Sequence, residues 1–412
     1  MRVVLSAYGS RGSVEPMVGL AVRLRELGAE VRVCAPPDEE FAERLAGVGV
    51  EVVPAGDPVR PLVTTVTPGS AAGLARRVAD LMDAQFDTLA AAAEGCDVLV
   101  VTGPLPAAAG ARSVAEKLGI RYVHASHQPV SLPSPHRAPP ARRGRPLPED
   151  EGDRRALWDL DARIADEMFG GELNARRASA GLPPVTGVRD YAFTDRPWMA
   201  ADPFLAPWQP TELDVVQTGA WILPDERPLP AGLTAFLDAG TPPVYVGFGS
   251  TPVPDPAGVA RAAVDAARAR GLRVVLARGW AGLAPVDDRD DCFVVDEVNQ
   301  QALFRRSAAV VHHGSAGTTT TAALAGVPQV VVPQGADQPY WAGRVAELGI
   351  GVAHDGPTPT AASLSAALAA ALAPATRERA AAVAGTVRTD GAAVAARLVL
   401  DEVDREGSPQ RA

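Results

Sequence analysis

Lysine is almost absent from this chain of 412 residues, because Lys117 is the only one. A P-loop needs a lysine after its glycines, and pyridoxal phosphate needs one for its Schiff base, so neither chemistry is predicted. Cysteine is also scarce: Cys34, Cys96 and Cys292 are widely spaced, which argues against a disulfide framework and against a zinc cluster. We expect three buried, apolar cysteines.

Long hydrophobic runs are missing as well. No stretch approaches the ~18 apolar residues that span a membrane, and the start, "MRVVLSAYG", lacks the pattern of a signal peptide. We therefore expect a cytoplasmic protein. The net charge of -10 disfavours nucleic acid and anionic membranes as partners, so we expect a protein that acts on small molecules. We also expect a monomer.

Two domains are predicted from the length, because single hydrophobic cores stop growing at roughly 250 to 300 residues. In the first half, short β-branched runs such as "VVLSA" and "VRVCA" alternate with amphipathic segments, and the second half repeats this with "PVYVGFGS", "AVVHHG" and "QVVVPQ". Such alternation predicts parallel sheets with helical crossovers. The expected fold class is therefore α/β, with two Rossmann-like domains.

The domain boundaries are predicted from Pro, Gly and charge. Residues 208–240 are interpreted as an interdomain linker with the first strand of the next domain, which separates domain 1–207 from domain 241–385. Residues 386–412 predict a terminal helix that covers the second domain or crosses back to the first. Residues 131–155 predict a long loop, either a solvated insertion or a functional lid.

Strand-to-helix turns are the candidate sites, because ligands bind at the carboxyl ends of parallel strands. The turn "YGSRGSVEP" either binds a ligand or simply needs glycine; it is not G-x-G-x-x-G, and no ribose-binding acid follows the second strand. In "GFGST", Ser250 and Thr251 bind a phosphate or cap a helix. In "RGWAGL", Trp280 is a base platform or a packing residue.

The turn "HHGSAGTTTT", which begins at His312, combines several signals. Its small residues leave the first N–H groups of a helix bare, and these groups with the helix dipole form an anion site suited to a diphosphate. His313 lies at the edge of this site, whereas alternation along the strand turns His312 to the other face, as a structural residue. After the next strand, Asp337 and Gln338 can hold sugar hydroxyls.

These motifs give the chain a family resemblance over essentially its whole length. With "GSRGSVEP", "TGAWILPDERPL", "HHGSAGTTT" and "PQGADQPYWAGRVAELG", it resembles GT-B glycosyltransferases of the nucleotide-sugar-dependent family 1. It is most similar to the actinobacterial enzymes for vancomycin-type and teicoplanin-type glycopeptide aglycones. The resemblance implies two domains facing a central cleft, and inverting transfer of a hexose from a UDP-sugar or dTDP-sugar to an aglycone hydroxyl, without a bound cofactor.

Site residues follow from the resemblance. Trp280, Ala281 and Val298 would border the base. The turn after His313 would contact the diphosphate, and Asp337 and Gln338 would hold the sugar. No metal is expected, because no DxD pattern occurs in a suitable turn and the helix N-terminus supplies positive charge. The implied donor contacts are Ser10, Arg11, Gly12, Gly219, Ser250, Thr251, Arg278, Gly279, Trp280, Ala281, Val298, His313, Gly314, Ser315, Ala316, Gly317, Thr318, Asp337 and Gln338.

One departure from the family concerns catalysis. The motif usually reads G-S-R-G-D, with the acid as general base, but here Ser13 stands in place of the acid. This serine is either natural or the result of an engineered substitution. Serine cannot act as a base unaided, so the candidates are His127, with His124 nearby in sequence, and Asp337. Both histidines could instead pack or contact the acceptor. Two alternatives stay open: a sugar-nucleotide-binding protein that has lost catalysis, and a dinucleotide-dependent oxidoreductase.

Overall fold

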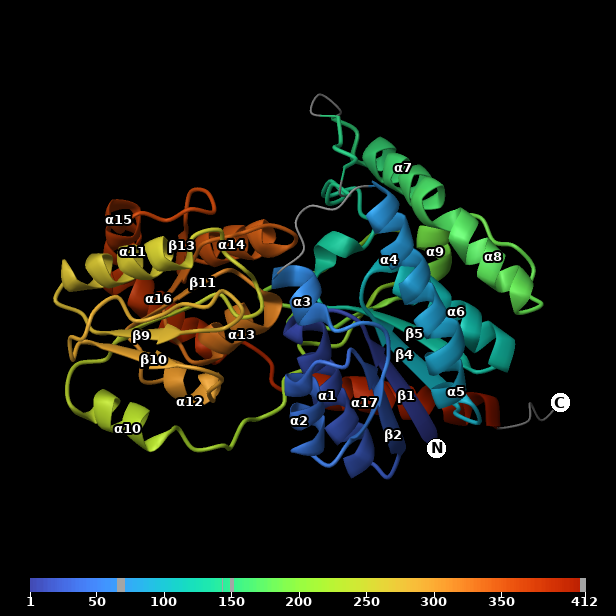
Figure 1. Cartoon of the computed structure of the whole chain (residues 1–412), viewed down its shortest axis with the longest axis horizontal. Coiled ribbons are helices and arrows are strands. Elements are labelled where there is room, and N and C mark those ends of the chain that lie inside the picture. Colours follow the sequence, from blue (N-terminus) through green and yellow to red (C-terminus); the bar gives the residue numbers. More distant parts are fainter. Residues whose placement is uncertain (65–70, 143, 149–151, 408–412) are drawn as a thin grey trace. The chain divides into compact units, whose positions relative to one another are not determined.

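The computed structural model describes residues 1–64, 71–142, 144–148 and 152–407. They divide into two compact units (Figure 1). Unit 1 comprises Met1–Leu223 and Thr389–Ala412, and unit 2 comprises Pro224–Arg388. Each unit is built on a parallel sheet, as the alternation of apolar runs predicts.

The sheet of unit 1 has the strand order β3-β2-β1-β4-β5-β6-β7, with every neighbouring pair parallel. The central strand β4 is buried along its whole length, which explains its continuous apolar run. The strands are β1 (Arg2–Ala7), β2 (Glu30–Ala35), β3 (Glu51–Pro54), β4 (Val98–Thr102), β5 (Arg121–Ser126), β6 (Trp198–Met199) and β7 (Val216–Gln217).

The first helix of unit 1 buries one face. Along the first helix, Val14, Met17, Ala21 and Leu24 recur at helical spacing and are buried. The helical segments are α1 (Arg11–Glu26), α2 (Glu39–Ala46), α3 (Val59–Thr64), α4 (Ala71–Ala84), η1 (Gln85–Leu89), α5 (Ala90–Ala93), α6 (Leu105–Leu118), η2 (Pro129–Ser131), α7 (Arg154–Ala165), η3 (Asp166–Gly170), α8 (Gly171–Ser179), α9 (Val188–Phe193) and α17 (Gly391–Gly407).

The sheet of unit 2 has the order β10-β9-β8-β11-β12-β13 and is also parallel. Alternation along β8 divides its side chains between two apolar clusters: Val244 and Val246 lie in one and Tyr245 in the other. The strands are β8 (Val244–Gly247), β9 (Val274–Ala277), β10 (Cys292–Val295), β11 (Ala309–His312), β12 (Gln329–Val331) and β13 (Gly351–Ala353).

Helices complete both clusters of unit 2. The first cluster includes residues of α11 and α15, and the second includes residues of α10, α12 and α13. The sheet is therefore covered on both faces, so its carboxyl edge is where loops are free to form a site. The helices are α10 (Ala231–Asp238), α11 (Pro256–Arg268), α12 (Gln300–Phe304), α13 (Ala316–Leu324), α14 (Gln338–Glu347), α15 (Ala361–Ala371) and α16 (Pro374–Ala384).

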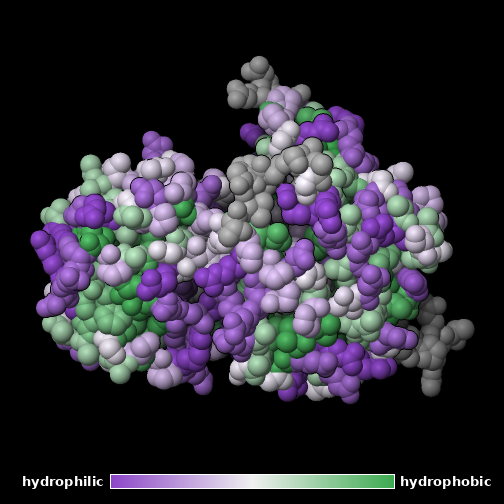
Figure 2. All heavy atoms as spheres, viewed as in Figure 1, coloured by the Kyte–Doolittle hydropathy of each residue, from purple (hydrophilic) through white to green (hydrophobic). Residues whose placement is uncertain are grey.

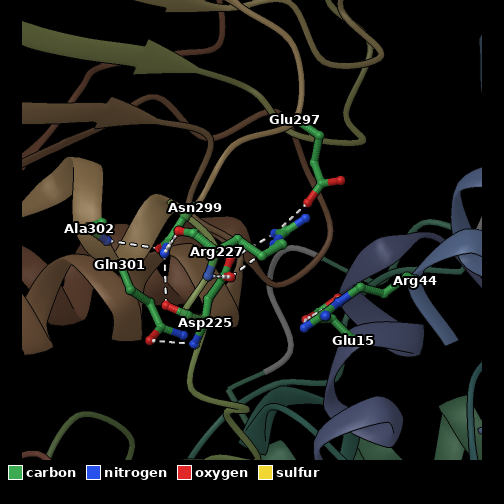
Figure 3. A network of polar contacts seen from close by, with 8 residues as sticks. All are labelled: Glu15, Arg44, Asp225, Arg227, Glu297, Asn299, Gln301 and Ala302. Carbon is green, nitrogen blue, oxygen red and sulfur yellow. Dashed lines mark hydrogen bonds and ion pairs between the residues drawn. The ribbon is translucent and has the colours of Figure 1, made fainter. Parts of the chain in front are cut away.

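The division between the units falls at residues 223/224, inside the segment 208–240 that the sequence analysis interprets as the linker. Strand β7 adds Val216–Gln217 to the sheet of unit 1. After the division, the Nδ2 group of Asn299 donates to the carbonyls of Asp225 and Arg227 at 2.7 and 2.8 Å, and Arg227 pairs with Glu297 at 2.8 Å (Figure 3). These bonds attach the following segment to unit 2.

Helix α17 belongs to unit 1, where it packs against α1. The unit-2 segment therefore ends at Arg388, close to the expected end of the second domain at residue 385. Of the two alternatives for residues 386–412, the structure has the one in which the chain returns to the first domain. Residues 408–412 lie outside the described residues.

The segment expected as a long loop, 131–155, has little regular structure where it is described, but side chains attach it to α7. Arg142 donates to both carboxylate oxygens of Asp161 at 2.7 and 2.9 Å, and the Trp158 indole donates to the Arg137 carbonyl at 2.8 Å. Residues 143 and 149–151 of this segment lie outside the described residues.

The surface mixes polar and apolar residues. On the face drawn in Figure 2, green apolar residues are interrupted by purple hydrophilic ones. Among the described residues, the exposed large hydrophobic side chains are Leu27 and Val63, at 46% and 39% exposure. Within the same part of the chain, every helix is too short or too polar to cross a membrane. Cys34 and Cys96 are buried, whereas Cys292 is half-buried.

Candidate functional site

The predicted turns of unit 2 meet at one edge of its sheet. The loops after β9, β8, β11 and β12 follow four strands that are neighbours in the sheet and run in the same direction. Their carboxyl ends therefore adjoin one another. These loops carry Gly279, Ser250, His313 and Asp337, so the fold gathers the residues that the motifs singled out.

The N-terminus of α13 is built from small residues. Ser315 is the N-cap, and its hydroxyl oxygen accepts a hydrogen bond from the Thr318 N–H at 3.4 Å. A Cβ added to Gly317 would meet no atom within 4 Å, so this backbone is open to a ligand. At Gly314 the φ angle is +94°, and an added Cβ would lie 2.6 Å from Val331, so only glycine fits. The remaining first-turn N–H groups can bind an anion.

The adjacent histidines have different environments. The ring of His312 is fully buried: the Gly314 N–H donates to its Nδ1 at 3.1 Å, so its Nε2–H donates to Gln329 Oε1 at 2.9 Å. The ring of His313 is 5% exposed and donates a hydrogen bond to the backbone of Gly247 through one ring nitrogen, but its Nδ1 has no partner among the described residues. His312 is thus structural, as strand alternation predicts, and His313 has a free ring nitrogen.

Burial keeps both rings neutral. It lowers the pKa of His312 to about 4 and that of His313 to about 3. The neighbouring His312 ring also lowers the pKa of His313, because two adjacent positive charges repel each other. An anion beside His313 would reverse part of this effect, because it favours the protonated ring.

Backbone contacts join the β8 and β9 loops. The Trp280 N–H donates to the Gly249 carbonyl at 2.8 Å, and a Cβ on Gly279, with φ +51°, would lie 2.5 Å from that oxygen. Trp280 is only 9% exposed. Ala281 and Val298 belong to different apolar clusters, and whether both border a base stays a prediction.

Four other predicted donor contacts are placed as follows. The Arg278 side chain pairs with Asp296 at 2.9 Å. The Thr251 hydroxyl accepts a long hydrogen bond, 3.5 Å, from the Gln338 amide, whereas Ser250 is half-buried. Gln338 also accepts from the Gln334 N–H at 2.6 Å, so its side chain already joins two loops of the site.

Asp337 directly precedes α14 and is the carboxylate predicted for the carboxyl edge of the unit-2 sheet. Its Oδ2 accepts a hydrogen bond from the Trp341 indole at 2.9 Å. Burial raises the pKa of Asp337, and hydrogen bonds from its own backbone and from Trp341 oppose that effect. The residue before it, Ala336, has a φ of +53°, which a non-glycine residue rarely adopts.

In unit 1, the predicted residues follow the carboxyl ends of β1 (Ser10 to Ser13), β5 (His127) and β7 (Gly219). Ser10 is the N-cap of α1 without a side-chain capping bond; Arg11 and Ser13 are half-buried, and Gly12 is exposed. What Ser10, Arg11 and Gly12 bind stays a prediction. Gly219 also belongs to unit 1, where an added Cβ would lie 3.1 Å from the Cα of Gly391.

His127 is the best placed of the proposed bases in unit 1. Its Nε2 lies 3.1 Å from the Thr102 hydroxyl, while its Nδ1 is buried without a partner among the described residues. Burial lowers the pKa of His127 to about 4 and that of His124 to about 3. His124 stacks on Phe193, with ring centroids 4.6 Å apart.

Sequence reasoning missed four residues of these sites: Gly249, Gln334, Trp341 and Thr102. Trp341 could have been found, because it follows Asp337 by four positions at a helix start and therefore shares its face. Gln334 is bonded to Gln338 within the same turn, whereas Gly249 and Thr102 depend on contacts between distant loops. Within the described residues, no group of three or more His, Cys, Asp or Glu side chains could hold a metal ion.

Comparison with known proteins identifies the class. The fold is similar to that of the solved glycotransferase of kitacinnamycin, with a TM-score of 0.71 and 21% identity over 97% of this chain and 98% of the other. Residues 12–169 match the "Glycosyl transferase 4-like domain" family, and residues 283–398 match "Erythromycin biosynthesis protein CIII-like, C-terminal domain". The fold and its site define a GT-B glycosyltransferase.

Two relatives from Amycolatopsis orientalis make the family specific. Glycosyltransferase GtfE is 60% identical over 98% of both chains, and Vancomycin aglycone glucosyltransferase is 59% identical over 98% of both. The chain belongs to this family of glycosyltransferases and is an enzyme. The comparisons do not favour a sugar-nucleotide-binding protein without catalysis or an oxidoreductase.

Proposed function

We propose that the enzyme transfers a hexose, with inversion, from a UDP-sugar or dTDP-sugar to a hydroxyl of a glycopeptide antibiotic aglycone. In this proposal unit 2 binds the donor and unit 1 the acceptor. The relative named Vancomycin aglycone glucosyltransferase, 59% identical along 98% of the chain, supports the class of acceptor. The carrying observation is the open N-terminus of α13 beside the unpartnered, buried Nδ1 of His313.

The donor diphosphate would lie at this N-terminus. Free N–H groups and the helix dipole supply hydrogen bonds and partial positive charge where negative charge develops on the leaving group. His313 adds a donor at Nδ1 when the bound anion favours its protonated ring. The bond between the anomeric carbon and the phosphate oxygen breaks, and the bond from the acceptor oxygen forms on the opposite face of the sugar. The nucleoside diphosphate leaves, and the acceptor proton passes to a base.

The sugar would be held by Asp337 and Gln338. The Asp337 carboxylate has one oxygen bonded to Trp341, which leaves the other as an acceptor for a hydroxyl. The Gln338 amide oxygen is engaged by the Gln334 N–H, so its contribution would come from the amide N–H groups. Asp337 is thus the stronger candidate for sugar recognition, and its catalytic role is a separate proposal.

For the base we favour His127 over Ser13. A serine hydroxyl has a pKa far above 7, whereas the His127 ring, with its pKa lowered to about 4, is neutral at physiological pH and carries a lone pair. The Thr102 hydroxyl engages one ring nitrogen and leaves the other for a ligand. Ser13 would then contact the acceptor rather than remove its proton.

We also propose that the enzyme acts in the cytoplasm as a monomer, without a nucleic-acid partner. The net charge of -10 supports the last point, because phosphate backbones repel such a protein. Light scattering of the purified protein at two concentrations tests the monomer: a mass of twice 42.6 kDa at both would contradict it.

The function is tested by incubating the purified enzyme with UDP-glucose or dTDP-glucose and a vancomycin-type or teicoplanin-type aglycone. The expected result is release of the nucleoside diphosphate together with an aglycone heavier by one hexose unit, linked with the inverted anomeric configuration. Release of UDP or dTDP without a glycoside would indicate hydrolysis. Saturable binding of the nucleotide to residues 1–223 instead of unit 2 would contradict the proposed division of roles.

A further inference from the structure

The turn between β12 and α14 is held by side chains of the helix that follows it. The Gln338 Oε1 accepts from the Gln334 N–H at 2.6 Å and closes the turn. Four residues after Asp337, the Trp341 indole donates to Asp337 Oδ2 at 2.9 Å. Trp341 is 1% exposed, so its N–H has no access to solvent and depends on this carboxylate.

Backbone strain occurs at the same place. Ala336, directly before Asp337, has a φ of +53°, a left-handed conformation that costs a non-glycine residue free energy. Such strain persists where the surrounding contacts over-determine the backbone, and it often accompanies ligand sites. The hydrogen bond that Gln338 accepts and the one that Trp341 donates are contacts of that kind.

The charge of Asp337 depends on few groups. Helix α14 packs against β12, β13 and α13, and the residues of these three elements include no Asp, Glu, Lys, Arg or His. On α14 itself, Arg344 and Glu347 pair at 2.5 Å. The Trp341 indole is therefore the side-chain donor that favours the ionised carboxylate against its burial.

We infer that Trp341 is a positioning residue: it fixes the Asp337 carboxylate through Oδ2, so that Oδ1 accepts a hydroxyl of the transferred sugar. Among the described residues, Oδ1 receives no hydrogen bond from another side chain. Trp341 therefore controls recognition of the hexose and not of the nucleotide. This inference rests on the proposed function, because it requires that unit 2 binds the sugar donor.

The test compares the affinity for UDP-glucose with that for UDP, and likewise dTDP-glucose with dTDP, in the absence of acceptor. Trp341→Phe keeps an aromatic ring but removes the N–H. A hydrogen bond to a charged group corresponds to about a 10- to 100-fold change. The affinity for the nucleotide sugar should fall by that factor, whereas the affinity for the nucleoside diphosphate should stay within about twofold.

A matched control is Trp158→Phe. Trp158 is also buried, lies on a helix and donates through its indole, at 2.8 Å to the Arg137 carbonyl. This substitution removes the same group in unit 1, so the ratio of the two affinities should be unchanged. A change in this ratio for Trp158→Phe equal to that for Trp341→Phe would overturn the inference.

Two further measurements separate positioning from packing. In an Asp337→Asn background, Trp341→Phe should add little, because both act on one interaction. The higher affinity for the nucleotide sugar than for the nucleoside diphosphate should also be lost as the pH falls through the pKa of Asp337. This loss should begin at a higher pH in Trp341→Phe, because removal of the donor raises the pKa further.

Asp337→Glu serves if Trp341→Phe does not fold. It keeps the charge but displaces the carboxylate from the indole, so the ratio should fall about tenfold or more if position matters. An unchanged ratio, equal losses for UDP and UDP-glucose, or additive effects in the double variant would each overturn the role of Trp341. If the wild-type protein binds neither nucleotide sugar, the proposed function itself fails.

Discussion

The two adjacent histidines of unit 2 give the sharpest prediction, because the same substitution should have opposite consequences at the two positions. His312→Ala and His313→Ala remove the same side-chain volume from sites that are 0% and 5% exposed. Similar cavity costs therefore cancel in the comparison. The difference that remains comes from the groups that each ring contacts.

His312→Ala leaves two buried partners unpaired, Gln329 Oε1 and the Gly314 N–H, at about 1–3 kcal/mol each. His313→Ala leaves only the backbone group at Gly247. His312→Ala should therefore destabilise the protein by about 1–3 kcal/mol more than His313→Ala. For turnover the order reverses: loss of a donor to the developing anion in His313→Ala should lower kcat by about 10²- to 10³-fold.

Urea unfolding of both variants, with equal m-values, measures the first difference, and hexose transfer per folded molecule measures the second. His312→Ala should stay within about tenfold of wild type in kcat, since its ring has no free nitrogen for a ligand. The reasoning is refuted if His313→Ala has normal turnover, or if it is the less stable of the two variants.

Three further predictions concern the base, the loops and acidity. His127→Gln should lower kcat by about 10²- to 10⁴-fold, and Ser13→Asp should restore much of this loss by supplying a carboxylate base; rates unaffected by both changes would exclude these residues as bases. Gly279→Ala should destabilise unit 2 by at least about 1 kcal/mol more than Gly282→Ala, because both have positive φ but only the former meets the Gly249 carbonyl; equal urea midpoints would contradict this. Burial lowers the pKa of His124, His127, His312 and His313 to about 3 or 4. Between pH 6.5 and about 4 the unfolded state therefore binds more protons than the folded state, so the free energy of unfolding should decrease as the pH is lowered, by about 1.4 kcal/mol per pH unit for each histidine. A free energy of unfolding that does not change over that range would show that these rings are protonated in the folded protein.

Much of the site could be predicted because it lies in local segments. The turn "HHGSAGTTTT" contains a strand end, a small-residue turn and a helix start, and each follows from the neighbouring residues. Strand alternation also separated the environments of His312 and His313 before any contact was known. Parallel topology then implied that turns far apart in the chain, such as those at Ser250 and Asp337, lie along one edge.

Other parts depended on contacts between distant segments. The division at 223/224 arises because Asn299 binds the carbonyls of Asp225 and Arg227, some seventy residues earlier in the chain. The requirement for glycine at position 219 comes from its closeness to Gly391, and a contact of Gly219 with the donor stays a prediction. Such pairs leave no periodic pattern in the sequence.

The sequence by itself determined the paired α/β architecture and the positions of the turns, because hydrophobic periodicity and helix-start chemistry are local properties. The class of enzyme followed from the resemblance of its motifs to a known family. Only the tertiary structure decided which polar groups are already satisfied. It engages the Gln338 amide, leaves one nitrogen of His313 without a partner and bonds Trp341 to Asp337. The physical reason is that hydrogen-bond pairing and burial, which set both orientation and pKa, depend on side chains from several strands and helices at once.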